Sequence, residues 1–180
     1  CESEMNKIKD LLQVSCVGKG LPSIPAGLPK DTGILLLGSN SLARVAMASF
    51  QHLQQLSELD LSNNSLEALE ASAPLPKLQQ LLLSHNSLGR LPDFRGLPGL
   101  KRLALGHNNI SRVPEGAFRD LGQLRDLELQ GNRLWRLPAG AFQGLGELRD
   151  LDLSENLLEG LPPDLLAELP NLEILRLERN

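Results

Sequence analysis

Apolar and polar residues alternate along this chain in a phrase that returns every 22 to 24 residues. The phrase has leucine at its fourth and sixth positions and asparagine at its ninth, as in residues 124–134 (LRDLELQGNRL) and 148–158 (LRDLDLSENLL). Alternation of this kind is the pattern of a strand with one buried face. We therefore expect positions 3 to 7 of each phrase to form a short strand whose side chains at positions 4 and 6 point inward.

The phrase covers most of the chain, within residues 32–180. Its asparagine position is filled seven times: Asn40, Asn64, Asn86, Asn108, Asn132, Asn156 and Asn180. The period and the phrase L-x-x-L-x-L-x-x-N-x-L are typical of leucine-rich repeats. The sequence predicts an α/β-type leucine-rich-repeat solenoid, with a curved parallel sheet on the concave face and irregular or short helical segments on the convex side.

Two further features follow from this repeat. The asparagine side chain can bond backbone groups where the chain leaves the strand, and so make the same turn in each repeat. The segments between phrases contain Phe50, Phe118 and Phe142, which we expect to pack in the core on the convex side. One repeat cannot bury its apolar face alone, so stability should come from contacts between neighbours.

Residues 1–31 lack the phrase and are expected to form an N-terminal cap and a lead-in to the repeats. They contain the two cysteines of the chain, Cys1 and Cys16. A solenoid needs its first apolar layer covered, and a disulfide-closed hairpin does this in extracellular proteins of this kind. We expect Cys1 and Cys16 to be bonded; the alternative is two free thiols in a reducing compartment. The chain stops at Asn180 within a phrase, so we expect it to be a segment of a longer protein.

Composition limits the possible functions. Of the 180 residues, 41% are hydrophobic and 3% aromatic, the net charge is -4 and the pI is about 5.4. The chain has no run of basic residues that would indicate nucleic-acid binding, and its mild acidity favours a basic protein partner. No apolar run approaches the ~20 residues that cross a bilayer. The sequence has no nucleophile, metalloprotease or phosphate-loop motif, so we expect a binding protein that uses no metal or cofactor rather than an enzyme.

Positions 3 and 5 of each phrase should project from the open, concave face of the sheet. Stacked strands lie about 4.8 Å apart, so two adjacent phrases place four carboxylates in one acidic square: Asp126, Glu128, Asp150 and Asp152. Acidic groups beside an apolar strip are typical of a protein-binding surface. The candidate contact residues on this face are Asp126, Glu128, Asp150, Asp152, Glu58, Asp60, Leu82, Arg102 and Arg176. The alternative is a solvated face that Arg125 and Arg149, at position 2, partly neutralise.

Other positions suggest less specific sites. Position 13 carries an arginine in four repeats, at Arg44, Arg90, Arg112 and Arg136. Such a column can attract sulfated glycans or an acidic partner, or simply keep that flank soluble. Trp135, at position 12, is expected to be partly exposed, either as an interface anchor or packed over the next repeat.

Two further residue pairs bear on metal binding and modification. His85 and His107 share position 8 of adjacent repeats and should lie close together. Without a third ligand they make a poor metal site. Asn63 and Asn109 begin N-x-S sequons that permit glycosylation if the protein is secreted.

Residues 1–16 (CESEMNKIKDLLQVSC), 21–42 (LPSIPAGLPKDTGILLLGSNSL) and 75–110, which include two shortened repeats, resemble one group of extracellular leucine-rich-repeat proteins. The resemblance is to the platelet glycoprotein Ib alpha chain and, second, to the serum leucine-rich alpha-2-glycoprotein. It implies the ligand-binding part of a cell-adhesion receptor in platelet hemostasis, which would bind the A1 domain of von Willebrand factor through its concave face and cap. The alternative it leaves is a secreted serum glycoprotein with another protein ligand. A matrix protein of the proteoglycan type would carry more cysteines in its cap.

Overall fold

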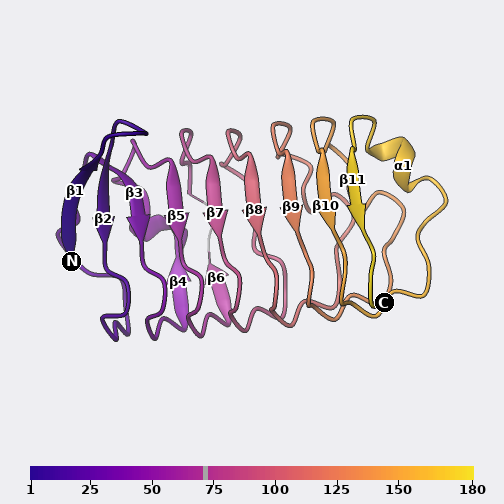
Figure 1. Cartoon of the computed structure of the whole chain (residues 1–180), viewed down its shortest axis with the longest axis horizontal. Coiled ribbons are helices and arrows are strands. Elements are labelled where there is room, and N and C mark those ends of the chain that lie inside the picture. Colours follow the sequence, from indigo (N-terminus) through magenta and orange to yellow (C-terminus); the bar gives the residue numbers. More distant parts are fainter. Residues whose placement is uncertain (71–72) are drawn as a thin grey trace.

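A computed structural model describes residues 1–70 and 73–180 and shows a solenoid, with the two ends of the chain at opposite ends of a long sheet (Figure 1). In the described residues this main sheet has nine strands, in chain order. They are β1 (Glu2–Asn6), β2 (Leu11–Ser15), β3 (Thr32–Leu36), β5 (Glu58–Asp60), β7 (Gln80–Leu82), β8 (Arg102–Ala104), β9 (Asp126–Glu128), β10 (Asp150–Asp152) and β11 (Ile174–Arg176). All pairs from β2 to β11 are parallel, which confirms the predicted solenoid and its parallel sheet.

The strands from β5 onward are shorter than the sequence predicts. They end at phrase position 5 rather than position 7. The hydrogen-bond ladder itself continues, since the amide of Leu61 donates to the carbonyl of Leu82 at 2.8 Å and that of Asn63 to Ser84 at 3.0 Å. Position 8, however, has a left-handed backbone, with φ of 54° at Asn63. The strand pleat is therefore lost before the turn, although the repeats remain bonded to each other.

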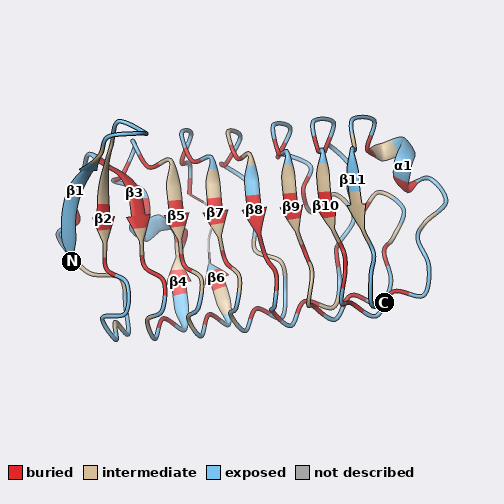
Figure 2. Ribbon diagram, viewed as in Figure 1, coloured by how far each residue is buried: buried red, intermediate tan, exposed pale blue. Residues whose placement is uncertain are grey.

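The core lies between the sheet and the convex segments. The leucines at positions 4 and 6 are fully enclosed, as Leu59 and Leu61 illustrate with an exposed fraction of 0%. Figure 2 shows this buried layer running along the strands. Burial of one such side chain stabilises a fold by about 1.5–3 kcal/mol. The leucine-rich core predicted from the phrase is thus confirmed.

Phenylalanines stack along the convex side of this core. Phe118 lies 6.1 Å from Phe142 and 5.9 Å from Phe94 between ring centroids. Phe50, Phe118 and Phe142 are buried, as expected. Phe94 extends the column into a 22-residue repeat. Phe94 was not among the predicted core phenylalanines, because the shorter repeat places it two positions earlier than Phe118 and Phe142.

Each phrase asparagine joins two repeats. The amide nitrogen of Asn132 donates to the carbonyls of Leu129 and Leu105, both at 3.0 Å, and its oxygen accepts from the amide of Ile110 at 3.1 Å. Leu129 belongs to the same repeat, whereas Leu105 and Ile110 belong to the preceding one. The other repeats form the same bonds, so the predicted role of asparagine at the turn is confirmed.

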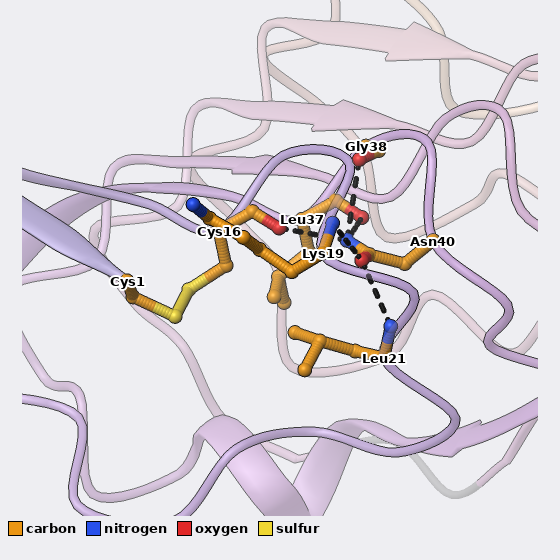
Figure 3. Close-up of a disulfide and its surroundings, with 7 residues drawn as sticks. All are labelled: Cys1, Cys16, Lys19, Leu21, Leu37, Gly38 and Asn40. Atoms are coloured by element: carbon orange, nitrogen blue, oxygen red, sulfur yellow. Dashed lines mark hydrogen bonds between the residues drawn. A yellow bond between two sulfur atoms is a disulfide. The ribbon is translucent and has the colours of Figure 1, made fainter.

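A hairpin of β1 and β2 covers the first repeat. Cys1 and Cys16 form the expected disulfide (Figure 3). β2 pairs in parallel with β3, so the cap extends the main sheet. The amide nitrogen of Asn40 donates to the Cys16 carbonyl at 2.9 Å, and its oxygen accepts from the amides of Lys19 and Leu21. The first turn asparagine therefore attaches the cap in the way that later asparagines attach repeats.

The convex side consists mainly of turns, as expected. It includes a short 3-10 helix η1 (Met47–Phe50) and one turn of α-helix α1 (Leu165–Glu168). A second small parallel sheet, which the sequence did not predict, pairs β4 (Arg44–Ala46) with β6 (Ala68–Glu70). In the described ranges, 1–70 and 73–180, no helix has the length and apolar character needed to cross a membrane.

Candidate protein-binding surface

The predicted acidic square is present on the open face of β9 and β10. Asp126 stands in register with Asp150, and Glu128 with Asp152. The leucines between them, Leu127 and Leu151, point into the core and are at most 1% exposed. All four carboxylates are half-buried. The strand alternation thus holds four acidic groups together on one face.

Arginines from the same face, rather than from position 2, compensate part of this charge. Arg102 on β8 lies 3.2 Å from the Glu128 carboxylate, and Arg176 on β11 lies 2.5 Å from that of Asp150. Arg125 and Arg149 are exposed and, within the described part of the chain, form no ion pair. The ion-pair partners of the square are therefore Arg102 and Arg176, not the position-2 arginines named in the alternative of a solvated face. Positions 3 and 5 of neighbouring strands are diagonal neighbours on one face, whereas position 2 precedes the strand.

The remaining two acids differ from each other. The Asp152 carboxylate accepts hydrogen bonds from the Ser154 amide at 3.0 Å and from its hydroxyl at 2.6 Å. Among the described residues, Asp126 has neither an ion-pair nor a hydrogen-bond partner for its side chain. The acids and the two arginines line a shallow depression of about 300 Å³. Four carboxylates against two guanidinium groups leave it a formal charge of −2.

The second acidic pair, Glu58 and Asp60 on β5, is used differently. Glu58 accepts from the ammonium group of Lys9 at 2.8 Å, and Lys9 belongs to the loop of the cap hairpin. The Asp60 carboxylate accepts from the Ser62 amide at 2.9 Å and its hydroxyl at 2.5 Å. Half-buried Leu82 on β7 lies between this pair and the acidic square. Both acids of this pair therefore already have partners within the protein.

The sequence predicts the serine partners of these acids better than it predicts the lysine partner. Ser62 and Ser154 each follow an aspartate by two residues, in the segment D-L-S. Asp and Ser at this spacing form local side-chain to backbone bonds, so that signal was present and missed. Lys9 has no such signal, because the repeat does not determine where the hairpin loop lies over the sheet.

The structure also places the less specific candidates: the histidine pair, Trp135 and the sequon asparagines. The rings of His85 and His107 stack with centroids 4.6 Å apart, as their shared position predicts. No group of three or more potential metal ligands occurs in the part of the chain that the structure describes. Trp135 is 53% exposed, in agreement with the expectation. Asn63 and Asn109, the sequon asparagines, are exposed.

Comparison with known proteins agrees with this architecture. The sequence profile of the leucine rich repeat family matches residues 33–88, 93–134 and 123–180. The chain belongs to the leucine-rich-repeat family. Leucine-rich-repeat solenoids carry extended concave binding surfaces as a class.

Relatives match parts of the chain. Leucine-rich repeat-containing protein 3 of Mus musculus is 48% identical over 60 residues, which are 33% of this chain and 23% of that protein. The platelet glycoprotein Ib alpha chain of Mus musculus is 41% identical over 73 residues, 41% of this chain and 10% of that one. The resemblance to platelet glycoprotein Ib alpha is thereby confirmed. The matched region spans about a quarter or less of these relatives.

A solved structure shows the same architecture over more of the chain. The crystal structure of a TLR13–ssRNA13 complex has a TM-score of 0.65 and 31% sequence identity, over 82% of this chain and 25% of that one. Solenoids of this family are typically interaction modules rather than enzymes.

Proposed function

We propose that this chain is an extracellular protein-binding module whose concave face, from β8 to β11, binds a basic surface of a protein ligand. The family and the relationship to platelet glycoprotein Ib alpha support a binding role. The disulfide supports an oxidising, extracellular compartment, because such bonds are rare in reducing ones. In this proposal residues 1–31 act as the cap and residues 32–180 as the binding solenoid.

The acidic square carries the proposal. Four half-buried carboxylates on two adjacent strands keep a formal charge of −2 after pairing with Arg102 and Arg176. Exposed charges interact over a Debye length of about 8 Å at physiological salt. A cluster of this kind steers an oppositely charged partner and raises its association rate more than its final affinity. Leu82, Arg102 and Arg176 complete the contact surface beside it, and Glu58 and Asp60 contribute only at its margin.

The resemblance names one candidate ligand. In platelet glycoprotein Ib alpha, the corresponding module would bind the A1 domain of von Willebrand factor, so we take that domain as the first ligand to test. The chain would then be part of a cell-adhesion receptor ectodomain in hemostasis. A secreted serum glycoprotein with a different protein ligand is the alternative, and failure to bind A1 with an intact concave face would favour it.

A catalytic role finds less support. The concave depression is shallow, whereas catalytic sites favour deep, mostly apolar pockets. Apart from Asp126, the acidic groups that the structure describes on this face are bonded to arginines, to Lys9 or to serines. The surface is suited to contact with another protein.

The direct test neutralises the square. The variant Asp126→Asn, Glu128→Gln, Asp150→Asn, Asp152→Asn should bind A1 at least tenfold more weakly at low salt, with a smaller loss at high salt. The circular dichroism spectrum of the variant should match that of the parent, which checks that the solenoid remains folded. If the folded variant binds A1 with unchanged affinity at both salt concentrations, the acidic square is not the binding surface.

A further inference from the structure

A column of arginines lies on the side of the solenoid that follows the asparagine turns. Arg90, Arg112 and Arg136 occupy position 13 of three consecutive repeats, and all three are exposed. Within the described residues none of them forms an ion pair. Arg44, at the same position nearer the cap, is paired with Glu70 at 2.7 Å. Three guanidinium groups are therefore available on three consecutive repeats.

These arginines border a groove. One depression of about 440 Å³ is lined by residues that include Arg90 and Arg112, and a second of about 400 Å³ by residues that include Arg112 and Arg136. The two depressions share Arg112 and Pro114, so they adjoin across three repeats. The groove follows the long axis of the solenoid because the repeats stack along that axis.

Trp135 supplies the apolar part of the second depression. It lines that depression with Val113 and Pro138, and 53% of its surface is exposed. A large aromatic side chain normally buries most of its surface, so its exposure beside arginines needs an explanation. A ligand that stacks on the indole ring while its anions contact the arginines would provide one.

The basic character of the groove ends on the convex side. Arg95 lies there, but it donates to Asp93, with a shortest distance of 2.6 Å. This hydrogen bond lowers the pKa of the Asp93 carboxyl below its ordinary value. Arg95 is thus already paired and adds no available cation to the groove.

We propose that this groove binds a linear sulfated polysaccharide. The planar guanidinium fork pairs well with tetrahedral oxyanions, and a sugar ring can lie on the exposed indole. A polysaccharide that carries anions along its length suits cations at a fixed period.

Trp135 itself provides the assay. It is the single tryptophan of the chain, which has no tyrosine, so intrinsic fluorescence reports almost solely on the groove. Titration with a size-defined heparin oligosaccharide should change the intensity or wavelength of this emission in a saturable way. The fully desulfated oligosaccharide should bind at least tenfold more weakly. If neither sugar changes the tryptophan emission of the protein or its electrophoretic mobility in a native gel, the proposal is overturned.

Two charge-matched variants separate a groove from general electrostatics. Arg90→Gln, Arg112→Gln, Arg136→Gln removes the column and should weaken oligosaccharide binding at least tenfold. The control, Lys101→Gln, Arg125→Gln, Arg149→Gln, removes the same charge from position 2 of three consecutive repeats and should change binding less than twofold. Equal losses in both variants would contradict the proposal. Binding of the Trp135→Ala variant, measured by calorimetry, should also be several-fold weaker.

Other occupants are distinguished in the same assay. A poly-glutamate peptide and a single-stranded oligonucleotide of matched charge should each bind at least tenfold more weakly than the sulfated sugar. If either binds as tightly and loses affinity with the arginine column, the groove is specific for that other polyanion and the assignment to a polysaccharide is wrong.

Discussion

Two acidic pairs on the same face of the sheet have the same phrase positions but different surroundings. On β5, Glu58 is bound by Lys9 of the cap and Asp60 by Ser62. On β9, Asp126 has no side-chain partner in the described structure and Glu128 is held only by Arg102. Each pair faces one cation and keeps a formal charge of −1, but both acids near the cap have partners, whereas in the middle of the solenoid the described structure gives the Asp126 side chain none.

The difference shows that position within the repeat does not by itself define function. The phrase determines that a side chain points outward, and the neighbouring strands determine whether it remains available. β5 lies close to the hairpin, which has its own loop and its own charges. β9 and β10 have only other repeats beside them, so like charges accumulate in register.

The largest expected effect comes from breaking the cap. Replacing Cys1 and Cys16 by serine opens a crosslink with a sequence separation of 15, which in the chain-entropy model contributes about 3 kcal/mol. The free energy of unfolding should fall by that amount in chemical denaturation. Hydrogen exchange should increase in β2 and β3 and remain low in β9 and β10. Equal deprotection of both regions would show that the two acidic pairs do not differ in their dependence on the cap.

A smaller effect separates two acids within the square. Asp152→Ala removes the acceptor of two bonds from Ser154 and should lower the free energy of unfolding by about 1–2 kcal/mol. Asp126→Ala removes no bond and relieves repulsion from Asp150, so stability should stay within about 0.5 kcal/mol of the parent or rise. Thermal and urea unfolding of the two variants measure this. If the two substitutions had equal effects, the Asp152–Ser154 contact would contribute nothing.

The smallest effect concerns the link between cap and sheet. The Lys9–Glu58 pair is partly exposed, with side-chain exposures of 45% and 16%. Exposed ion pairs contribute about 0.2–1 kcal/mol. A double-mutant cycle with Lys9→Met and Glu58→Gln should therefore give a coupling of about 0.5 kcal/mol that weakens in high salt. A coupling of zero at low salt would remove the main reason for treating Glu58 as structural.

Much of the fold could be predicted because it depends on the phrase alone. The inward leucines and the turn asparagines were inferred from residue spacing, and the disulfide from the need for an N-terminal cap that contains both cysteines; the structure has all three. Strand length was overestimated because alternation continues through position 7 in the sequence, while the left-handed backbone at position 8 ends the pleat.

The site was less predictable, since it depends on contacts between repeats. The square itself followed from register, but its arginine partners did not. Arg102 and Arg176 reach their carboxylates across the face from neighbouring strands, and which of several nearby arginines does so depends on side-chain direction. The small sheet of β4 and β6 joins the segments that follow the first two asparagine turns, and its pairing has no counterpart in the phrase.

The central claim is that the square on β9 and β10 is available to a partner while the pair on β5 is not. The most direct test compares A1 association rates for the fourfold variant of the square and for Glu58→Gln, Asp60→Asn, at low and physiological salt. We expect the fourfold variant to lower the association rate about tenfold and to flatten its salt dependence, with less than a twofold change in the β5 variant. Equal rates for both variants and the parent, or a larger loss in the β5 variant, would contradict the account.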